Sequence, residues 1–295
     1  MPRTLLMLFG FTFATASAAE PVAHGFLATG GETFIVDDAG KETWKYPASS
    51  RDGWVLPSGH ILLALSKSKA YPGGAIIELD RAGKTLFEFK GTQSEVNTVE
   101  PLADGSYLLT EAGGKPRILE VDAKGKIVIE VAINAQTKDI HLQTRMTRKL
   151  ANGNYLVPQL LDKVVREYDA KGKVVWEAKT PNMPFTAIRL PDGNTLIGCT
   201  HGNLVIEIDP KGKEIWRVSN DDLPGKPLSD CCGVQRLDNG NTVMTSYNAG
   251  PKKVKLTEVT RDKKIVWQYT DERQVGIHHF QILDGLGRPS KNPLR

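Results

Sequence analysis

The sequence predicts an all-β protein, a six-bladed β-propeller built from four-stranded blades. Three observations predict it. Two short motifs recur with one period, each period contains four strand-like segments, and the two ends of the chain supply complementary parts of one period. Four short strands repeated every forty to fifty residues or so are typical of a propeller.

The first motif is a leucine followed three residues later by a glycine, as in "LPDGNTLIG" at 190–198. A leucine, a turn that contains glycine and a short apolar run indicate two strands joined by a tight turn. The copies begin at Leu56, Leu102, Leu150, Leu190 and Leu237, and a shortened copy begins at Leu283. Successive leucines lie 46, 48, 40, 47 and 46 residues apart.

The second motif is a lysine-containing turn followed by a bulky apolar residue, as in "DAKGKVVW". The bulky positions are Trp44, Phe87, Ile129, Trp176, Trp216 and Trp267, spaced 43, 42, 47, 40 and 51 residues apart. Two independent motifs with one period indicate a repeat array. The aspartate of each turn can accept hydrogen bonds from its own turn backbone, which explains the motif without calcium. The recurrent tryptophan is expected to pack between neighbouring blades.

One copy shows how the strands fit. We predict strands A to D at 185–190, 194–200, 204–209 and 213–218, because these segments are rich in Val, Ile, Thr and Trp. Gly, Asn and Asp occupy the turns between them, where positive φ angles are needed.

The two ends of the chain predict how the ring closes. Residues 25–44 match strands B, C and D but lack A, whereas "GIHHFQIL" at 276–283 matches strand A alone. Together they complete a composite blade, which removes exposed sheet edges and fixes both ends of the chain. Five whole copies and this shared blade give six.

The first residues predict export. One arginine, an apolar run from Leu5 to Phe13 and small residues before Ala19 are typical of a signal peptide at 1–19. The alternative is an uncleaved anchor. We therefore expect residues 20–295 to form a single propeller domain, periplasmic or extracellular, without stable membrane insertion. The net charge of +4 is scattered, which disfavours a nucleic-acid partner. A closed ring needs no partner for its edges, so a monomer is expected.

The repeat "E-x-D-x-x-G-K-x-V-W" resembles that of quinoprotein-like (PQQ-like) propellers, and "L-P-D-G-N-T-L" resembles the six-bladed arylsulfotransferase-like propellers. The resemblance covers nearly all of the chain after the signal segment, and it implies the fold. The second family implies an axial histidine with arginine and histidine partners. Quinoprotein dehydrogenases also have vicinal cysteines that contact the quinone, and this chain has Cys231 and Cys232.

Strand direction predicts which residues share a face. Strand A starts at the face where strand B ends, and we call this face the top. The top-face histidines and cysteines are His141, His201, His278, His279, Cys199, Cys231 and Cys232, whereas His60 lies at the bottom. The residues nearest the axis by register are Arg51 and Asp52, Asn97 and Thr98, Arg145 and Met146, Phe185 and Thr186, and Cys232 and Gly233. A funnel lined by such side chains suits a polar or anionic ligand.

Two sets of candidate site residues follow. The ligand-binding candidates are Arg51, Asp52, Asn97, Arg145, His201 and His279, and the catalytic candidates are His278, His279, His141 and Arg145. Successive strand residues point to opposite sides, so His278 and His279 differ in orientation. A general-base histidine needs an orienting acceptor, for which Asp52 or Glu100 could serve.

The three cysteines allow several arrangements in an exported protein. A disulfide from Cys199 to Cys231 or to Cys232 is geometrically plausible, and a strained bridge between Cys231 and Cys232 is an alternative. Free thiols and a metal shared with His201 or His279 are further alternatives. No C-x-x-C or H-x-x-H pattern is present, so no metal site is predicted.

These observations favour a binding platform, which would hold a small polar or anionic ligand, or an exported protein partner, in the top-face channel. The first alternative is an arylsulfotransferase-like or hydrolytic enzyme that uses the axial histidines and arginine. The second is a quinone-dependent oxidoreductase. No cofactor is predicted with the binding platform; pyrroloquinoline quinone or a divalent metal belongs to the alternatives.

Overall fold

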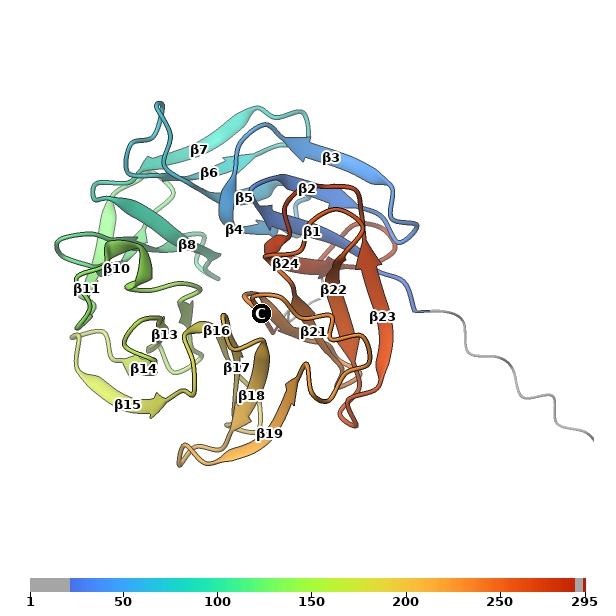
Figure 1. Ribbon diagram of the computed structural model, residues 1–295. Helices are drawn as coiled ribbons and strands as arrows, with labels where there is room; N and C mark the ends of the chain where they lie inside the picture. Colours follow the sequence, from blue (N-terminus) through green and yellow to red (C-terminus); the bar gives the residue numbers. More distant parts are fainter. Residues whose placement is uncertain (1–21, 290–293) are drawn as a thin grey trace, which may run out of the picture.

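The computed structural model describes residues 22–289 and 294–295. In this part of the chain, six antiparallel sheets of four strands each surround a central axis (Figure 1). The predicted all-β, six-bladed propeller is therefore confirmed. The predicted signal segment, 1–19, lies outside the described residues. None of the described helical segments is long and apolar enough to span a membrane.

In each blade the four strands lie side by side, and they are named below in order from the axis to the outside. The first three blades contain β24 (Ile277–Leu283), β1 (Gly25–Gly30), β2 (Thr33–Val36) and β3 (Glu42–Tyr46); β4 (Ser50–Val55), β5 (Ile61–Leu65), β6 (Ala75–Leu79) and β7 (Thr85–Lys90); and β8 (Glu95–Pro101), β9 (Tyr107–Ala112), β10 (Arg117–Val121) and β11 (Ile127–Ala132). We number these blades 1 to 3, and blade 1 is the composite blade.

Blades 4 to 6 follow in chain order. They contain β12 (Arg148–Lys149), β13 (Tyr155–Gln159), β14 (Val164–Tyr168) and β15 (Val174–Lys179); β16 (Pro184–Arg189), β17 (Thr195–Cys199), β18 (Leu204–Ile208) and β19 (Glu214–Ser219); and β20 (Val234–Arg236), β21 (Thr242–Thr245), β22 (Val254–Val259) and β23 (Ile265–Thr270). A 3-10 turn, η1 (Ile140–Leu142), precedes blade 4.

The ring closes through blade 1, as predicted. Strand β24 pairs antiparallel with β1, from Gly25 opposite Leu283 to Thr29 opposite His279. All seven residues of β24 are buried. Strand β24 is thus the innermost strand of blade 1, and its pairing with β1 joins the two ends of the ring.

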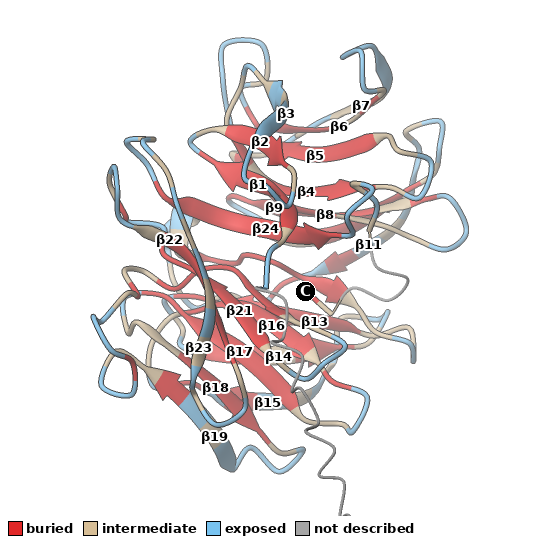
Figure 2. Ribbon diagram, turned by 90° about the vertical axis from the view of Figure 1, so that its right-hand side faces the viewer, coloured by how far each residue is buried: buried red, intermediate tan, exposed pale blue. Residues whose placement is uncertain are grey.

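The core lies between the blades. The three inner strands of each blade are largely buried, and the fourth strand alternates between exposed and partly buried residues (Figure 2). The recurrent tryptophans join neighbouring blades, as expected. The indole N–H of Trp176 donates to the carbonyl of Pro210 at 2.9 Å, and that of Trp216 donates to the carbonyl of Arg261 at 2.8 Å.

The lysine-containing turns are closed by their own aspartates, as the sequence predicts. A carboxylate oxygen of Asp37 accepts the backbone N–H groups of Ala39 at 3.1 Å and Lys41 at 2.8 Å. The same pair of bonds forms at Asp122, Asp169 and Asp209. These motif residues therefore serve the turn.

The glutamate of the repeat, on the third strand of blades 2 to 6, connects each blade to the next. Its five partners across the blade boundaries are Tyr107 for Glu78 (2.5 Å), Tyr155 for Glu120 (2.6 Å), Arg189 for Glu167 (2.9 Å), Arg236 for Glu207 (2.9 Å) and His24 for Glu258 (2.6 Å). The motif that carries the family resemblance is thus structural, and function has to come from residues that differ between blades.

Candidate functional site

The site begins with irregularities in the innermost strands. In β4, Ser50 pairs with Leu65 and Asp52 pairs with Ala64, so Arg51 is an extra residue with no partner in the ladder. The same bulge isolates Asn97 in β8, Phe185 in β16 and His278 in β24. A bulge redirects the side chain of the extra residue.

Two more residues hold the equivalent position in the other blades. Arg145 precedes β12 and donates its backbone N–H to the carbonyl of Pro158, and Cys232 precedes Gly233, whose carbonyl accepts from Thr245. The six equivalent residues, which we call the axial ring, are Arg51, Asn97, Arg145, Phe185, Cys232 and His278. Five of them are the first members of the pairs that the register predicted, and His278 was a catalytic candidate.

The axial ring converges at the top of the channel. The rings of Phe185 and His278 meet edge to face at 4.4 Å, and the guanidinium of Arg145 lies 5.9 Å from the Phe185 ring centre. Above them opens a pocket of about 260 Å³, lined by Gly30, Gly31, Ser49, Ser50, Arg51, Ser66, His141, Tyr247 and His278. The pocket is large enough for a small ligand and is mostly polar in its lining residues.

One carboxylate, Glu95, contacts several basic side chains at the pocket. Its oxygens lie 3.4 Å from Arg51, 3.1 Å from His141 and 3.7 Å from Lys67. Burial acts to raise the pKa of Glu95, but the hydrogen bond from His141 and the charge of Arg51 lower it to about 2. Glu95 is therefore an anion at any physiological pH, and its negative charge is already shared among Arg51, His141 and Lys67.

Arg145 is a buried cation without a carboxylate of its own. Its side chain is 1% exposed, and one Nη donates to the carbonyl of Thr144 at 2.7 Å. Among the described residues, no carboxylate lies within ion-pair distance of it. Burial and the charge of Arg51 lower the pKa of Arg145 to about 9. The protein thus holds this charge at an energetic cost.

Several buried polar atoms of the axial ring have no hydrogen-bond partner among the described residues. The Nε atoms of Arg51 and Arg145 and both side-chain amide atoms of Asn97 are buried, and none has a hydrogen-bond partner within the described part of the chain. Buried polar groups are nearly always paired, so each such group calls for an explanation. The two Nε atoms are therefore donors that the described part of the protein encloses without pairing them.

His278 lines the pocket together with His141. Its ring packs against Phe185 and, at 4.9 Å, against Tyr247. Burial, followed by the charges of Arg145 and Arg51, lowers its pKa well below the usual 6.5. The imidazole is therefore neutral near pH 7.

A Cβ at Gly276 would lie 2.1 Å from the carbonyl oxygen of Ser246, so only glycine allows this approach of the two loops.

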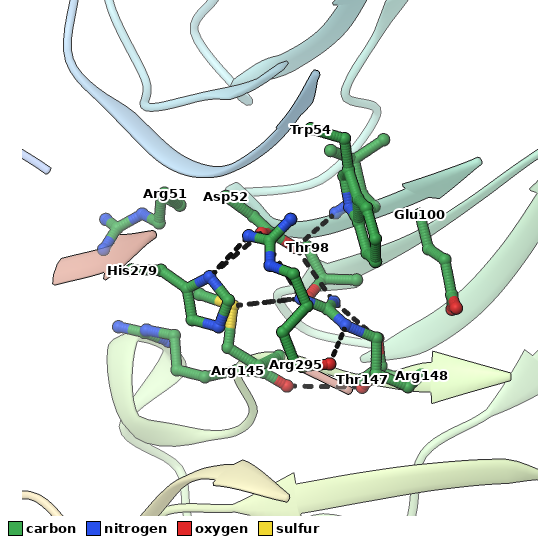
Figure 3. A network of polar contacts seen from close by, with 12 residues as sticks. Arg51, Asp52, Trp54, Thr98, Glu100, Arg145, Thr147, Arg148, His279 and Arg295 are labelled. Atoms are coloured by element: carbon green, nitrogen blue, oxygen red, sulfur yellow. Dashed lines mark hydrogen bonds and ion pairs between the residues drawn. The ribbon is translucent and has the colours of Figure 1, made fainter. Parts of the chain in front are cut away.

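Asp52 and His279 lie in a separate layer beneath the axial ring. Both are fully buried, and Nδ1 of His279 lies 3.5 Å from Asp52 and 2.7 Å from an Nη of Arg295 (Figure 3). Burial and the charge of Arg295 lower the pKa of His279 well below 6.5. The expected acceptor Asp52 is therefore near His279, but neither residue lines the pocket, because each follows the bulge and points away from it.

Glu100 and His201 also lie away from the pocket. Glu100 accepts the backbone N–H of Lys149 at 2.8 Å, and burial raises its pKa to about 7. His201 is exposed on the loop between β17 and β18, where its ring lies 3.4 Å from Asp230. Of the ligand-binding candidates, Arg51 lines the pocket together with the catalytic candidates His278 and His141, and Arg145 is buried beside Arg51.

All three cysteines are free, buried thiols in the structure. Cys199, Cys231 and Cys232 each pack in a different hydrophobic cluster. The disulfide that the sequence favoured is therefore not formed, because the three side chains point into different inter-blade spaces. Burial raises the pKa of Cys199 and of Cys232 to about 12, which leaves both thiols protonated.

The residues do not fit a quinone or a metal. The vicinal thiols are enclosed, and Sγ of Cys232 lies 3.4 Å from the hydroxyl of Thr200 with Met146 and Phe185 around it, so neither thiol is presented to a flat ligand. Within residues 22–289 and 294–295, no group of three or more His, Cys, Asp or Glu side chains could hold a metal ion.

Several members of these two layers are not predicted by the sequence. Glu95, Lys67, Tyr247, Arg148 and Arg295 are brought in by loops or by long-range packing. Glu95 and Arg148 lie near the predicted axial positions, so strand register carried a signal for them. No local pattern identifies Arg295.

Comparisons with known proteins agree with the fold. A family model described as outer membrane protein assembly factor BamB, of the PQQ-like repeat type, matches residues 161–279 and so confirms the resemblance to PQQ-like propellers over less than half of the chain. No curated protein sequence matches.

Solved structures extend the likeness to most of the chain. A Bacteroides caccae protein of unknown function is 23% identical with a TM-score of 0.78, over 89% of this chain and 100% of that one. A catalytically inactive virginiamycin B lyase from Staphylococcus aureus, solved with quinupristin, is 15% identical with a TM-score of 0.60, over 90% and 94%. At these identities the likeness shows the fold alone.

Proposed function

We propose that the protein is an exported binding protein whose axial pocket holds a small oxyanion, such as a carboxylate, sulfate or phosphate group. The observation that carries the proposal is a pair of guanidiniums: Arg51 lines the pocket, and Arg145 is buried beside it with no carboxylate partner among the described residues. Arg51 shares the carboxylate of Glu95 with His141 and Lys67. The pocket therefore has an excess of positive charge.

The chemistry of the donors favours an oxyanion. Guanidinium groups bind planar or tetrahedral oxyanions with two parallel hydrogen bonds, and such charge-assisted bonds are the strong ones. Arg51 lines the pocket and supplies guanidinium donors, and Arg145, buried beside it, adds positive charge. His278 is neutral, and its ring packs against the aromatic ring of Tyr247. A small apolar part of a ligand could pack against these two rings.

Isothermal titration calorimetry at low ionic strength tests the proposal with sulfate, phosphate and succinate as separate probes. Binding of at least one probe is expected, and Arg145→Gln or Arg51→Gln should weaken it about 10- to 100-fold, the equivalent of one charge-assisted hydrogen bond. Arg288→Gln, at an exposed arginine paired with Asp284, is the matched control and should leave affinity unchanged.

Stability of the free protein separates a binding role from a structural one. Arg145→Gln removes an uncompensated buried charge, so the free energy of unfolding should stay within about 1 kcal/mol of the original or rise. A loss of several kcal/mol, with anion affinity intact, would show that Arg145 serves the fold. If no probe binds, the protein-partner alternative takes its place, to which the BamB description of the matching family model points.

The enzyme alternative rests on His278, with His141 beside it in the pocket. A hydrolytic or transfer reaction would centre on His278, which lines the pocket as a neutral imidazole between Arg51 and Arg145. A neutral histidine can act as a general base. Turnover of phosphate, sulfate or carboxylate esters that is lost in His278→Gln, with anion affinity retained, would favour this reading.

A further inference from the structure

The lower half of the channel contains a second site, whose occupant is a residue of the chain itself. The side chain of Arg295 is fully buried there. One Nη donates to the carbonyl of Gly53 at 2.7 Å, and the other lies 3.2 Å from Asp52. Its guanidinium lies over the ring of Trp54, 4.2 Å from the ring centre (Figure 3).

The backbone beside Arg295 forms a single β-bridge with the edge of the blade 6 sheet. Leu294 pairs antiparallel with Arg236 of β20, whose N–H donates to the Leu294 carbonyl at 2.9 Å. Nε of Arg148 donates to the carbonyl of Arg295 at 3.0 Å. The side chain of Leu294 packs against the hydrophobic cluster between blades 5 and 6. In Figure 1 this end of the chain lies at the centre of the ring.

These contacts have the form of peptide recognition. Backbone pairing on a sheet edge supplies affinity, and pockets for individual side chains supply specificity. Here the edge is β20, the apolar contact receives Leu294, and the polar pocket receives a guanidinium. A carboxylate, a carbonyl and an aromatic face together match the planar fork of arginine better than the point charge of lysine.

Space for a longer segment lies next to the bridge between Leu294 and Arg236. A pocket of about 310 Å³ is lined by residues of β20, β24 and the turns that follow them, including Arg236 and Leu283. Arg236 pairs with Leu294, and Leu283 pairs with Pro289. The pocket therefore lies along the edge on which the chain's own segment is seated.

We propose that the lower channel is a binding site for an extended peptide segment carrying an apolar residue followed by arginine, which the chain's own Leu294–Arg295 occupies in cis. A segment of the same chemistry on a partner protein can occupy it in trans when the cis segment leaves. The site is independent of the oxyanion pocket, because it uses Asp52, Trp54 and β20 and none of the axial ring.

The test removes the side chains that occupy the site in cis and then supplies a peptide that can bind there. The full chain carrying Leu294→Ser and Arg295→Ala is followed by thermal unfolding with an N-acetylated, C-amidated peptide NPLR, and with NPLK as the matched control. NPLR should raise the Tm in proportion to the logarithm of its concentration. NPLK should bind at least about tenfold more weakly. Adding Asp52→Asn should abolish the effect of NPLR.

Each outcome decides the proposal. Equal effects of NPLR and NPLK, or no effect of NPLR at millimolar concentration on the folded variant, would overturn it. If the variant does not fold, it is refolded with each peptide, and recovery with NPLR but not NPLK supports the site, whereas recovery with neither contradicts it. Sulfate titration of the same variant should be unchanged, which separates this proposal from the oxyanion pocket.

Discussion

The two halves of the channel each contain two arginines, of which Arg51 is partly exposed and the other three are buried, and the halves differ in how these charges are paired. In the lower half, Arg148 and Arg295 share Asp52, which lies 2.9 Å from Arg148 and 3.2 Å from Arg295, and both guanidiniums lie over Trp54. In the upper half, Arg51 has only a share of Glu95, and Arg145 has no carboxylate partner among the described residues. The lower cations are compensated, and the upper ones are not.

This difference separates stability from binding. A compensated buried ion pair is costly to break, because removing one partner leaves the other charge buried alone. An uncompensated buried charge already bears that cost, and an incoming anion can relieve it. The lower layer should therefore govern folding, and the upper layer should govern ligand affinity.

The largest expected effect comes from Asp52→Asn. This change removes the carboxylate that two buried guanidiniums share, and we expect the free energy of unfolding to fall by roughly 3–5 kcal/mol. Urea denaturation measures it. Asp221→Asn, at a 91% exposed side chain paired with Lys226, is the control and should change stability by less than about 0.5 kcal/mol. Equal effects at the two positions would remove the distinction between the layers.

Glu95→Gln is expected to act on both stability and binding. The pKa of Glu95 is about 2 in the folded protein against an ordinary 4.5. Its stabilising effect is therefore fully present above about pH 4.5 and is lost as the pH falls through about 2. Between pH 5 and pH 2.5, urea midpoints should fall more steeply in the original protein than in Glu95→Gln.

The same substitution should strengthen anion binding at neutral pH. Removing Glu95 frees Arg51 from its carboxylate and leaves the pocket more positive, so the Kd for the best oxyanion probe should fall several-fold, which titration calorimetry measures. Weaker binding in Glu95→Gln would mean that Glu95 mainly orients Arg51, and the comparison between the two layers would then rest on Arg145 alone.

The fold was predictable because its signals are local and repeated. The spacing of Leu-x-x-Gly and of the bulky residues predicted the six blades, and the incomplete copies at the two ends predicted how the ring closes. The site depends on single-residue bulges at Arg51, Asn97, Phe185 and His278, and a register that alternates strictly cannot show them. This is why Asp52 and His279 were expected at the pocket and lie beneath it. The position of Arg295 depends on long-range packing with no local signature.

The smallest expected effect concerns the apolar side of the axial ring, where Cys232 and Phe185 face the cationic side. If the thiols are free as in the structure, Ellman's reagent should detect three per chain after unfolding without reductant, and almost none before, because all three are buried. Reductant should then leave the Tm unchanged. One thiol per chain would instead show that the predicted disulfide forms in solution. The inter-blade packing around Cys199 and Cys231 or Cys232 would then have to shift, and with it the apolar wall against which Arg145 lies.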